Sequence, residues 1–137
     1  MATTAVPFML IFRESPEYYS GMSEDKRRQI LSTWNAWYDG LARQGKATGG
    51  NALDIATSRT VSGPHGERLV DGPYAEAKEA IAGYFMLSVS GMEEATEIAR
   101  HCPNLAYGMT VEVRPLATAC HIAKSLAMDS MREPIRS

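Results

Sequence analysis

The chain has 137 residues, of which 45% are hydrophobic and 22% charged, enough to build one domain with its own core and too apolar for a disordered protein. Its formal net charge of −2 carries no basic surplus, so we expect no direct binding to nucleic acid. Cys102 and Cys120 stand outside any CxxC pattern, which argues against a disulfide framework and a zinc site and favours a reducing compartment. The first apolar run is too short to cross a membrane and has no basic leader, so we expect a cytoplasmic protein.

The first half of the chain predicts a strand, a helix and a hairpin. Residues 6–12 are apolar at both alternating sets of positions, as in a central strand covered on both faces. Ser23 is suited to cap a helix whose apolar stripe continues to Leu41, and Gly45 is suited to end it. We expect a loop from Gly49-Gly50, then a strand over residues 55–61 and a hairpin that returns through residues 68–70.

The second half predicts a strand, a helix, a strand and a tail. Residues 82–89 alternate as a strand, and Gly83 within it indicates a bulge or the close approach of another backbone. A helix should begin at Met92 and end before Pro103, and the last strand should span residues 108–115. Residues 117–137 form a C-terminal extension, with a third helix expected to end before Pro134.

This order of elements predicts an α+β fold of the ferredoxin-like, split βαβ type, with an antiparallel sheet, an added hairpin and both helices on one face. We interpret residues 1–137 as a single domain whose core spans about residues 6–116. The uncovered face of the sheet would carry Met9 or Phe12 together with Tyr84 and Met86, which is too apolar to face water. We therefore expect a homodimer with the two sheets face to face and a cleft between them.

Several short motifs resemble the DGPF-domain branch of the YCII-related family. The most specific is Asp71-Gly72-Pro73 followed by residues 75–79, AEAKE, with Tyr74 where the family usually has phenylalanine. The resemblance is supported by Trp34, Trp37 and the closing residues 111–116, VEVRPL. It implies a dimeric α+β barrel of the ferredoxin-like type.

The resemblance also implies two roles. Some YCII-like proteins resemble small-molecule enzymes that use a histidine of the first helix, close to Trp34 here, and an aspartate beyond the second strand; the first helix of this chain contains no histidine. DGPF proteins are often associated with extracytoplasmic-function sigma factors, which implies an accessory role in transcription with a sigma factor as partner.

Asp71 is the first candidate for a functional residue. An Asp-Gly-Pro sequence makes a turn in which the aspartate accepts backbone hydrogen bonds and the proline opens a short helix. The functional alternative places Asp71 at the mouth of the intersubunit cleft as a base. The charged cluster of Glu76, Lys78 and Glu79 is typical of a solvated face, although one of its acids could meet Arg59.

Further candidates come from the strands. Glu112 and Arg114 are two residues apart and share a face, where they could bind a small anionic ligand or form an ion pair across the dimer seam. A bulge at Gly83 would direct Tyr84 towards the cleft, and Trp34 belongs to the same candidate binding set. The three histidines are too scattered for joint catalysis, and no spacing predicts a metal site or a cofactor.

The leading hypothesis is a small-ligand-binding or accessory dimer, with a sigma factor as its partner if it is regulatory. The alternative is a cofactor-independent enzyme of the isomerase or elimination type, with Asp71 as the base and Arg59 or Arg114 steadying a developing anion.

Overall fold

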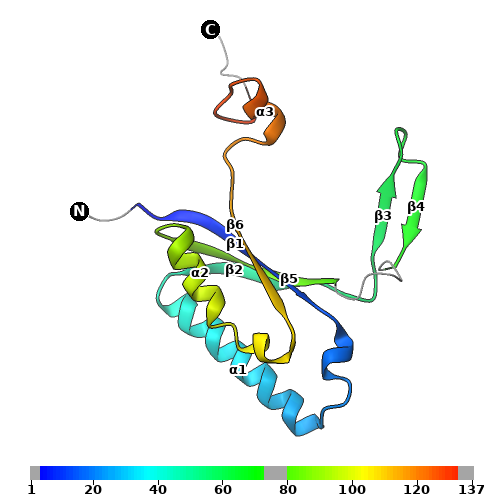
Figure 1. Cartoon of the computed structure of the whole chain (residues 1–137), viewed down its shortest axis with the longest axis vertical. Coiled ribbons are helices and arrows are strands. Elements are labelled where there is room, and N and C mark those ends of the chain that lie inside the picture. The colour runs from blue at the N-terminus through cyan, green and yellow to red at the C-terminus, as the bar shows by residue number, and fades with distance from the viewer. Residues whose placement is uncertain (1–3, 73–79, 133–137) are drawn as a thin grey trace.

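The computed structural model describes residues 4–72 and 80–132, and it has a four-stranded antiparallel sheet with helices on one side (Figure 1). The elements in chain order are β1 (Val6–Glu14), η1 (Pro16–Tyr19), α1 (Glu24–Arg43), β2 (Ala47–Ala52), β3 (Arg59–Ser62), β4 (Arg68–Asp71), β5 (Ala80–Val89), α2 (Met92–Arg100), η2 (Pro103–Tyr107), β6 (Thr110–Pro115) and α3 (His121–Ser125). The sheet order β2-β5-β1-β6 is the split βαβ arrangement, and β3 pairs with β4 in a separate two-stranded sheet. The predicted ferredoxin-like α+β fold with an added hairpin is therefore confirmed.

The predicted ends of the first helix are confirmed. Ser23 caps α1, because its side chain accepts a hydrogen bond from the Lys26 backbone N–H at 3.1 Å. Gly45 follows the helix with a φ of 73°, a conformation that glycine adopts without a steric penalty. Pro103 does not continue α2 and instead begins η2.

The second strand of the sheet was not predicted. The sequence suggested a loop at Gly49-Gly50 and a strand over residues 55–61, but β2 covers residues 47–52 and pairs with β5 at the sheet edge, and β3 begins only at Arg59. The prediction failed because β2 contains Gly49 and Gly50. Glycine is rare in strands, so these residues do not give the alternating pattern that predicts one. Gly50 is required by packing: a Cβ there would lie 2.6 Å from the Tyr84 carbonyl oxygen.

One side of the sheet forms the core against α1 and α2. Phe8, Leu10 and Phe12 of β1 are buried on this side, opposite Leu87, Phe85 and Gly83 of β5 in the strand register. Because strand side chains alternate, the intervening residues point to the other side. Phe12 therefore faces the helices, which corrects its place as an alternative to Met9 on the uncovered face.

A β-bulge interrupts the pairing of β1 with β5. Phe12 pairs with Gly83 and the next residue, Arg13, pairs with Ile81, so Ala82 is an extra residue in β5. A Cβ on Gly83 would lie 2.6 Å from the Asn51 carbonyl oxygen. Both expectations for Gly83, a bulge and a close backbone approach, are confirmed.

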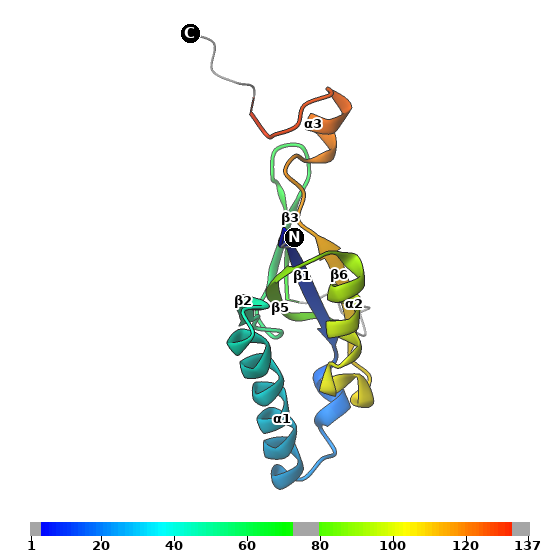
Figure 2. The ribbon, with the colours of Figure 1, turned by 90° about the vertical axis from the view of Figure 1, so that its left-hand side faces the viewer.

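The other side of the sheet, which we call the open face, carries Met9, Ile11, Tyr84 and Met86 along its centre. All four side chains are half-buried. Both α1 and α2 lie on the opposite side of the strands (Figure 2). The sheet-to-sheet homodimer predicted for this face stays a prediction.

Two arms extend from the domain, the β3–β4 hairpin and the C-terminal segment of residues 117–132 (Figure 1). The third helix that the sequence predicted before Pro134 is present as α3, but it is short: it covers only His121–Ser125, and Ala127 has a φ of 59°, which ends the helical backbone. The charged cluster of Glu76, Lys78 and Glu79 and the short helix expected at Pro73 lie outside the described residues. Among residues 4–72 and 80–132, no helix has both the length and the hydrophobicity that crossing a bilayer requires.

Candidate functional site

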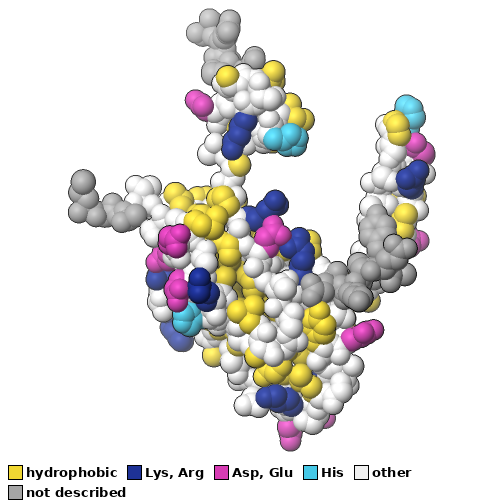
Figure 3. Space-filling model, viewed as in Figure 1, with side chains coloured by type: hydrophobic (Ala, Val, Ile, Leu, Met, Phe, Trp, Pro, Cys, Tyr) yellow, Lys and Arg dark blue, Asp and Glu magenta, His cyan; other side chains and the backbone are white. Residues whose placement is uncertain are grey.

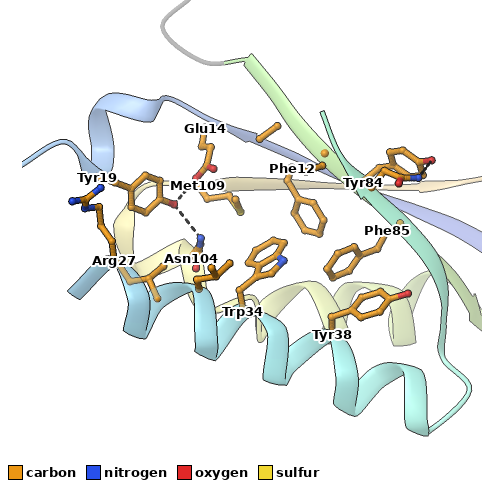
Figure 4. Close-up of a pocket in the computed structure, with 17 residues that line it drawn as sticks. Phe12, Glu14, Tyr19, Arg27, Trp34, Tyr38, Tyr84, Phe85, Asn104 and Met109 are labelled. Atoms are coloured by element: carbon orange, nitrogen blue, oxygen red, sulfur yellow. Dashed lines mark hydrogen bonds between the residues drawn. The ribbon is translucent and has the colours of Figure 1, made fainter. Parts of the chain in front are cut away.

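A pocket of about 490 Å³ lies between α1 and the helix-covered side of the sheet (Figure 4). Its walls are aromatic: Phe12 and Phe85 come from the strands, and Trp34 and Tyr38 come from α1. The ring centroids of Phe12 and Trp34 lie 4.8 Å apart at 75°, and those of Tyr38 and Phe85 lie 4.8 Å apart at 64°, which are edge-to-face contacts. These contacts hold the walls in place, so the pocket is formed without a ligand.

Two glycines give the pocket part of its room. Gly50 pairs with Phe85, and Gly83 pairs with Phe12, and both glycines line the pocket. Paired residues of an antiparallel ladder face the same side, so each glycine leaves a position next to a phenylalanine without a side chain. Glycine in these strands thus permits both close backbone packing and an adjacent hollow.

The polar end of the pocket is a chain of three residues from three separate elements. The Tyr19 hydroxyl of η1 donates a hydrogen bond to the Glu14 carboxylate at the end of β1, and it accepts one from the Asn104 Nδ2 of η2 at 3.1 Å (Figure 4). Asn104 is 8% exposed, and its Oδ1 atom has no hydrogen-bond partner among the described residues. A buried acceptor without a partner costs about 1–3 kcal/mol, so a ligand that donates a hydrogen bond there would recover this energy.

Burial sets the protonation of this end. Removal from water raises the pKa of the Glu14 carboxyl, and the hydrogen bond from Tyr19 opposes that rise. The pKa of Tyr19 is also raised, first by burial and then by the hydrogen bond to Glu14. Tyr19 therefore stays a hydrogen-bond donor at neutral pH. Arg27 of α1 also lines this end, and it forms no ion pair with another described residue.

Comparison with protein families identifies the chain. The model of the YCII-related domain matches residues 6–117, most of the chain. The chain belongs to the YCII-related family. All the pocket residues lie within the matched range, whereas α3 lies beyond it.

Two individual proteins are similar to this YCII-related protein. Uncharacterized protein R00369 from Rhizobium meliloti (strain 1021) is 41% identical over 54 residues, which are 38% of this chain and 44% of that protein, so the match spans less than half of the relative's length. The structure of 5-chloro-2-hydroxyhydroquinone dehydrochlorinase (TftG) from Burkholderia phenoliruptrix AC1100, in complex with 2,5-dihydroxybenzoquinone, aligns with a TM-score of 0.48 and 12% identity over 82% of this chain and 95% of that chain.

Of the residues predicted from the sequence, Trp34 and Tyr84 border the pocket of this YCII-related domain. Trp34 lines it with its indole ring, close to the position where the family resemblance expects a histidine (Figure 4). Tyr84 lies at the rim, although the register places its side chain on the open face, where its hydroxyl accepts a hydrogen bond from the Asn51 Nδ2 at 2.9 Å.

Asp71 and Arg59 lie together, but outside this pocket. They form an ion pair across the hairpin, with 2.6 Å between the Arg59 Nε and the Asp71 Oδ1. Their side chains are 65% and 76% exposed, and they border a separate shallow depression that Ala56 and Gly72 also line. Asp71 therefore lies too far outside the pocket to contact a ligand bound there, and its role as a base at an intersubunit cleft stays a prediction.

Glu112 and Arg114 lie on the open face. The Glu112 carboxylate binds the Arg13 Nη1 at 2.5 Å and the Arg114 Nε at 2.8 Å. The hydrogen bond from Arg13, followed by the charges of both arginines, lowers the pKa of Glu112. The two predicted residues thus form an ion-pair cluster within one subunit, on the opposite side of the sheet from the pocket.

The sequence reasoning missed Glu14, Tyr19, Arg27 and Asn104. One signal for Glu14 was available, because it continues the alternation of Phe8, Leu10 and Phe12 and so places a carboxylate on the buried side at the end of the strand. No comparable signal marked Asn104, which meets Tyr19 across 85 residues of sequence. In the described part of the chain, no three His, Cys, Asp or Glu residues gather in a way that could hold a metal ion.

Proposed function

We propose that this YCII-related domain binds a small, planar, mainly apolar ligand in the pocket between α1 and the sheet. The observation that carries the proposal is the unpaired Oδ1 atom of Asn104 at the end of an aromatic-walled pocket. Ligand sites are typically hollows of about 300–1,000 Å³ that combine apolar walls with a few polar groups, as this pocket does.

The polar end specifies the ligand further. Asn104 Oδ1 requires a hydrogen-bond donor, and Arg27 lies at the same end as a cation that no described residue pairs. An aromatic ring with a hydroxyl group satisfies the first requirement. An acidic substituent next to the hydroxyl would use the second.

The test is a matched set of three probes. Phenol has both the ring and the donor, anisole has the ring without the donor, and cyclohexanol has the donor without the planar ring. We expect phenol to bind at least about ten times more tightly than either of the others, because a lost buried hydrogen bond is worth about 1.5 kcal/mol. Ligand-observed NMR titration measures all three dissociation constants.

Two variants connect that preference with the pocket. Asn104→Leu should reduce the preference for phenol over anisole to less than about three-fold, because it removes the acceptor with little change in volume. Asn35→Leu, which makes the same change at an exposed position of α1, should leave the preference unchanged. Equal binding of phenol by wild type and Asn104→Leu, with both proteins folded, would contradict the proposal.

A second candidate function is the cofactor-independent enzyme, with Glu14 rather than Asp71 as the acid or base. The observation that favours it is the raised pKa of Glu14, a carboxyl that borders the pocket. A panel of lactones and quinols should then lose turnover in Glu14→Gln and keep it in Asp71→Asn. The accessory role with a sigma factor stays a prediction from the family resemblance, to be tested by co-purification.

A further inference from the structure

The hairpin arm has an apolar patch that its own chain leaves exposed. Val61 and Leu69 face each other across β3 and β4, and each is 60% exposed. The two strands form a sheet of their own and pair with neither edge of the main sheet. An isolated two-stranded hairpin is at best marginally stable in water, so this hairpin needs a partner to pack against its apolar side chains.

The C-terminal arm shows the same lack of packing. Ile122 and Leu126 are 61% and 66% exposed, and Met131 is 60% exposed. A helix of five residues has almost no stability of its own, because nucleation is costly and propagation has only just begun. Figure 3 shows hydrophobic side chains on both arms, separated from the body of the domain.

Both arms extend on the same side of the sheet. The two ribbon views agree that the hairpin and the C-terminal segment lie beyond the strands on the side away from α1 (Figures 1 and 2). The helices cover the opposite side, so the arms flank the open face with its apolar centre of Met9, Ile11, Tyr84 and Met86. The open face and the apolar patches of the arms can thus belong to a single interaction surface.

We propose that the β3–β4 hairpin and the C-terminal segment are clasping arms that pack against a second copy of this chain, seated with its open face on the open face of the first. The homodimer itself was expected from the sequence, and the new element is that the arms close it. The proposal does not depend on the ligand proposed above, because the pocket lies on the opposite side of the sheet.

A second copy fits better than an unrelated partner for two reasons. A two-fold axis through the open face would give each subunit the arms of the other, so both sets of apolar residues would be covered in one step. Two carboxylates of the surface are also already paired within the subunit: Glu112 binds Arg13 and Arg114, and Asp71 binds Arg59. An identical face can therefore approach without leaving either of these two carboxylates buried and unpaired.

Sedimentation equilibrium of the full chain tests the proposal with one variant in each part of the surface. Wild type should have twice the mass of one chain at micromolar concentration. Leu69→Asp in the hairpin and Ile122→Asp in α3 should each raise the dimer dissociation constant at least about ten-fold, because each places a charge in an apolar contact. Met86→Asp should do the same from the open face.

Leu31→Asp is the matched control. Leu31 is 60% exposed like Leu69, but it lies on α1 on the covered side of the sheet, so its substitution should leave the dissociation constant unchanged. A wild type that remains monomeric at 100 µM (roughly a hundred times the micromolar range at which specific dimers form) overturns the proposal. It is equally overturned if Met86→Asp separates the subunits while both arm variants dimerise like wild type, because the arms would then make no contact with the second copy.

Discussion

The two sides of the sheet differ in how much of their apolar surface a single chain covers. On the covered side, Leu10 is fully buried among aromatic and aliphatic neighbours. Its neighbour Met9 is only half-buried on the open face, although it lies in the same strand at the same depth in the sheet. The side chains of a strand alternate between the two faces of the sheet. A strand with apolar residues on both faces therefore needs a packing layer on each face. Here the helices of the chain supply the first partner, and we propose that a second copy supplies the other.

The largest expected effect comes from comparing these two neighbours. Leu10→Ala should lower the free energy of unfolding by about 2–5 kcal/mol, because it leaves a cavity in a packed core. Met9→Ala should cost less than about 1 kcal/mol in dilute solution, and its cost should grow as the protein concentration rises, since association would then bury that position. Urea unfolding at two protein concentrations measures both. Equal costs for the two variants at low concentration would remove the distinction between the sides.

An intermediate effect on stability is expected at Gly49 and Gly50, the two consecutive glycines of β2. Gly50→Ala should destabilise the fold by about 1–3 kcal/mol, because the new Cβ would lie 2.6 Å from a backbone oxygen and also approach Phe85. Gly49→Ala should change stability by less than about 0.5 kcal/mol, because nothing lies within 4 Å of its Cβ position on the other side of the strand. Thermal unfolding of the two variants compares a glycine on the pocket side with one on the open side. A neutral Gly50→Ala would mean that β2 and β5 do not approach as closely as described.

The smallest expected effect is a change in how stability depends on pH, caused by Glu14 on the covered side of the sheet. The pKa of Glu14 is raised above 4.5 in the folded protein, so between 4.5 and the folded pKa the native state binds more protons than the unfolded state. The contribution of Glu14 to stability is therefore largest at low pH and falls as the pH rises through that window. Glu14→Gln should remove this fall, so that the variant gains stability relative to wild type as the pH is raised from 4 to 8 (roughly the range that brackets a raised carboxyl pKa).

The control for this measurement lies on the open face. The pKa of Glu112 is lowered, so Glu112→Gln should show the opposite trend and lose stability relative to wild type as the pH rises through the range just below 4.5. The same trend in both variants would contradict the assignment of a buried carboxyl to the pocket and a paired carboxyl to the open face.

The sequence was most informative where a local rule decided the structure. The apolar alternation of residues 6–12, the cap at Ser23 and the glycine at position 45 each depend on nearby backbone geometry, and each prediction was confirmed. β2 was not predicted because its sequence, ATGGNA, has few of the β-branched and aromatic residues that are typical of strands. Its place in the sheet depends on tertiary contact with β5, which no local pattern reveals.

The candidate site was harder to predict, because long-range packing assembles it. Trp34 and Tyr84 were predicted as ligand-binding residues, and both border the pocket. Its polar end required Glu14, Tyr19 and Asn104 to meet from three elements that are distant in sequence. The conspicuous Asp-Gly-Pro motif drew attention to Asp71 instead, and that residue lies at the base of an exposed hairpin.

The extra residue Ala82 has a consequence for what the pocket can admit. If β1 and β5 paired without the bulge, Ile81 would lie opposite Glu14, and its branched side chain would block the polar end of the pocket. Because the bulge leaves Ala82 unpaired, Ile81 pairs with Arg13 on the open face, and the small Ala80 takes the place beside Glu14. The bulge therefore keeps a branched side chain away from the polar end of the pocket and places it on the face where we propose that a second subunit packs.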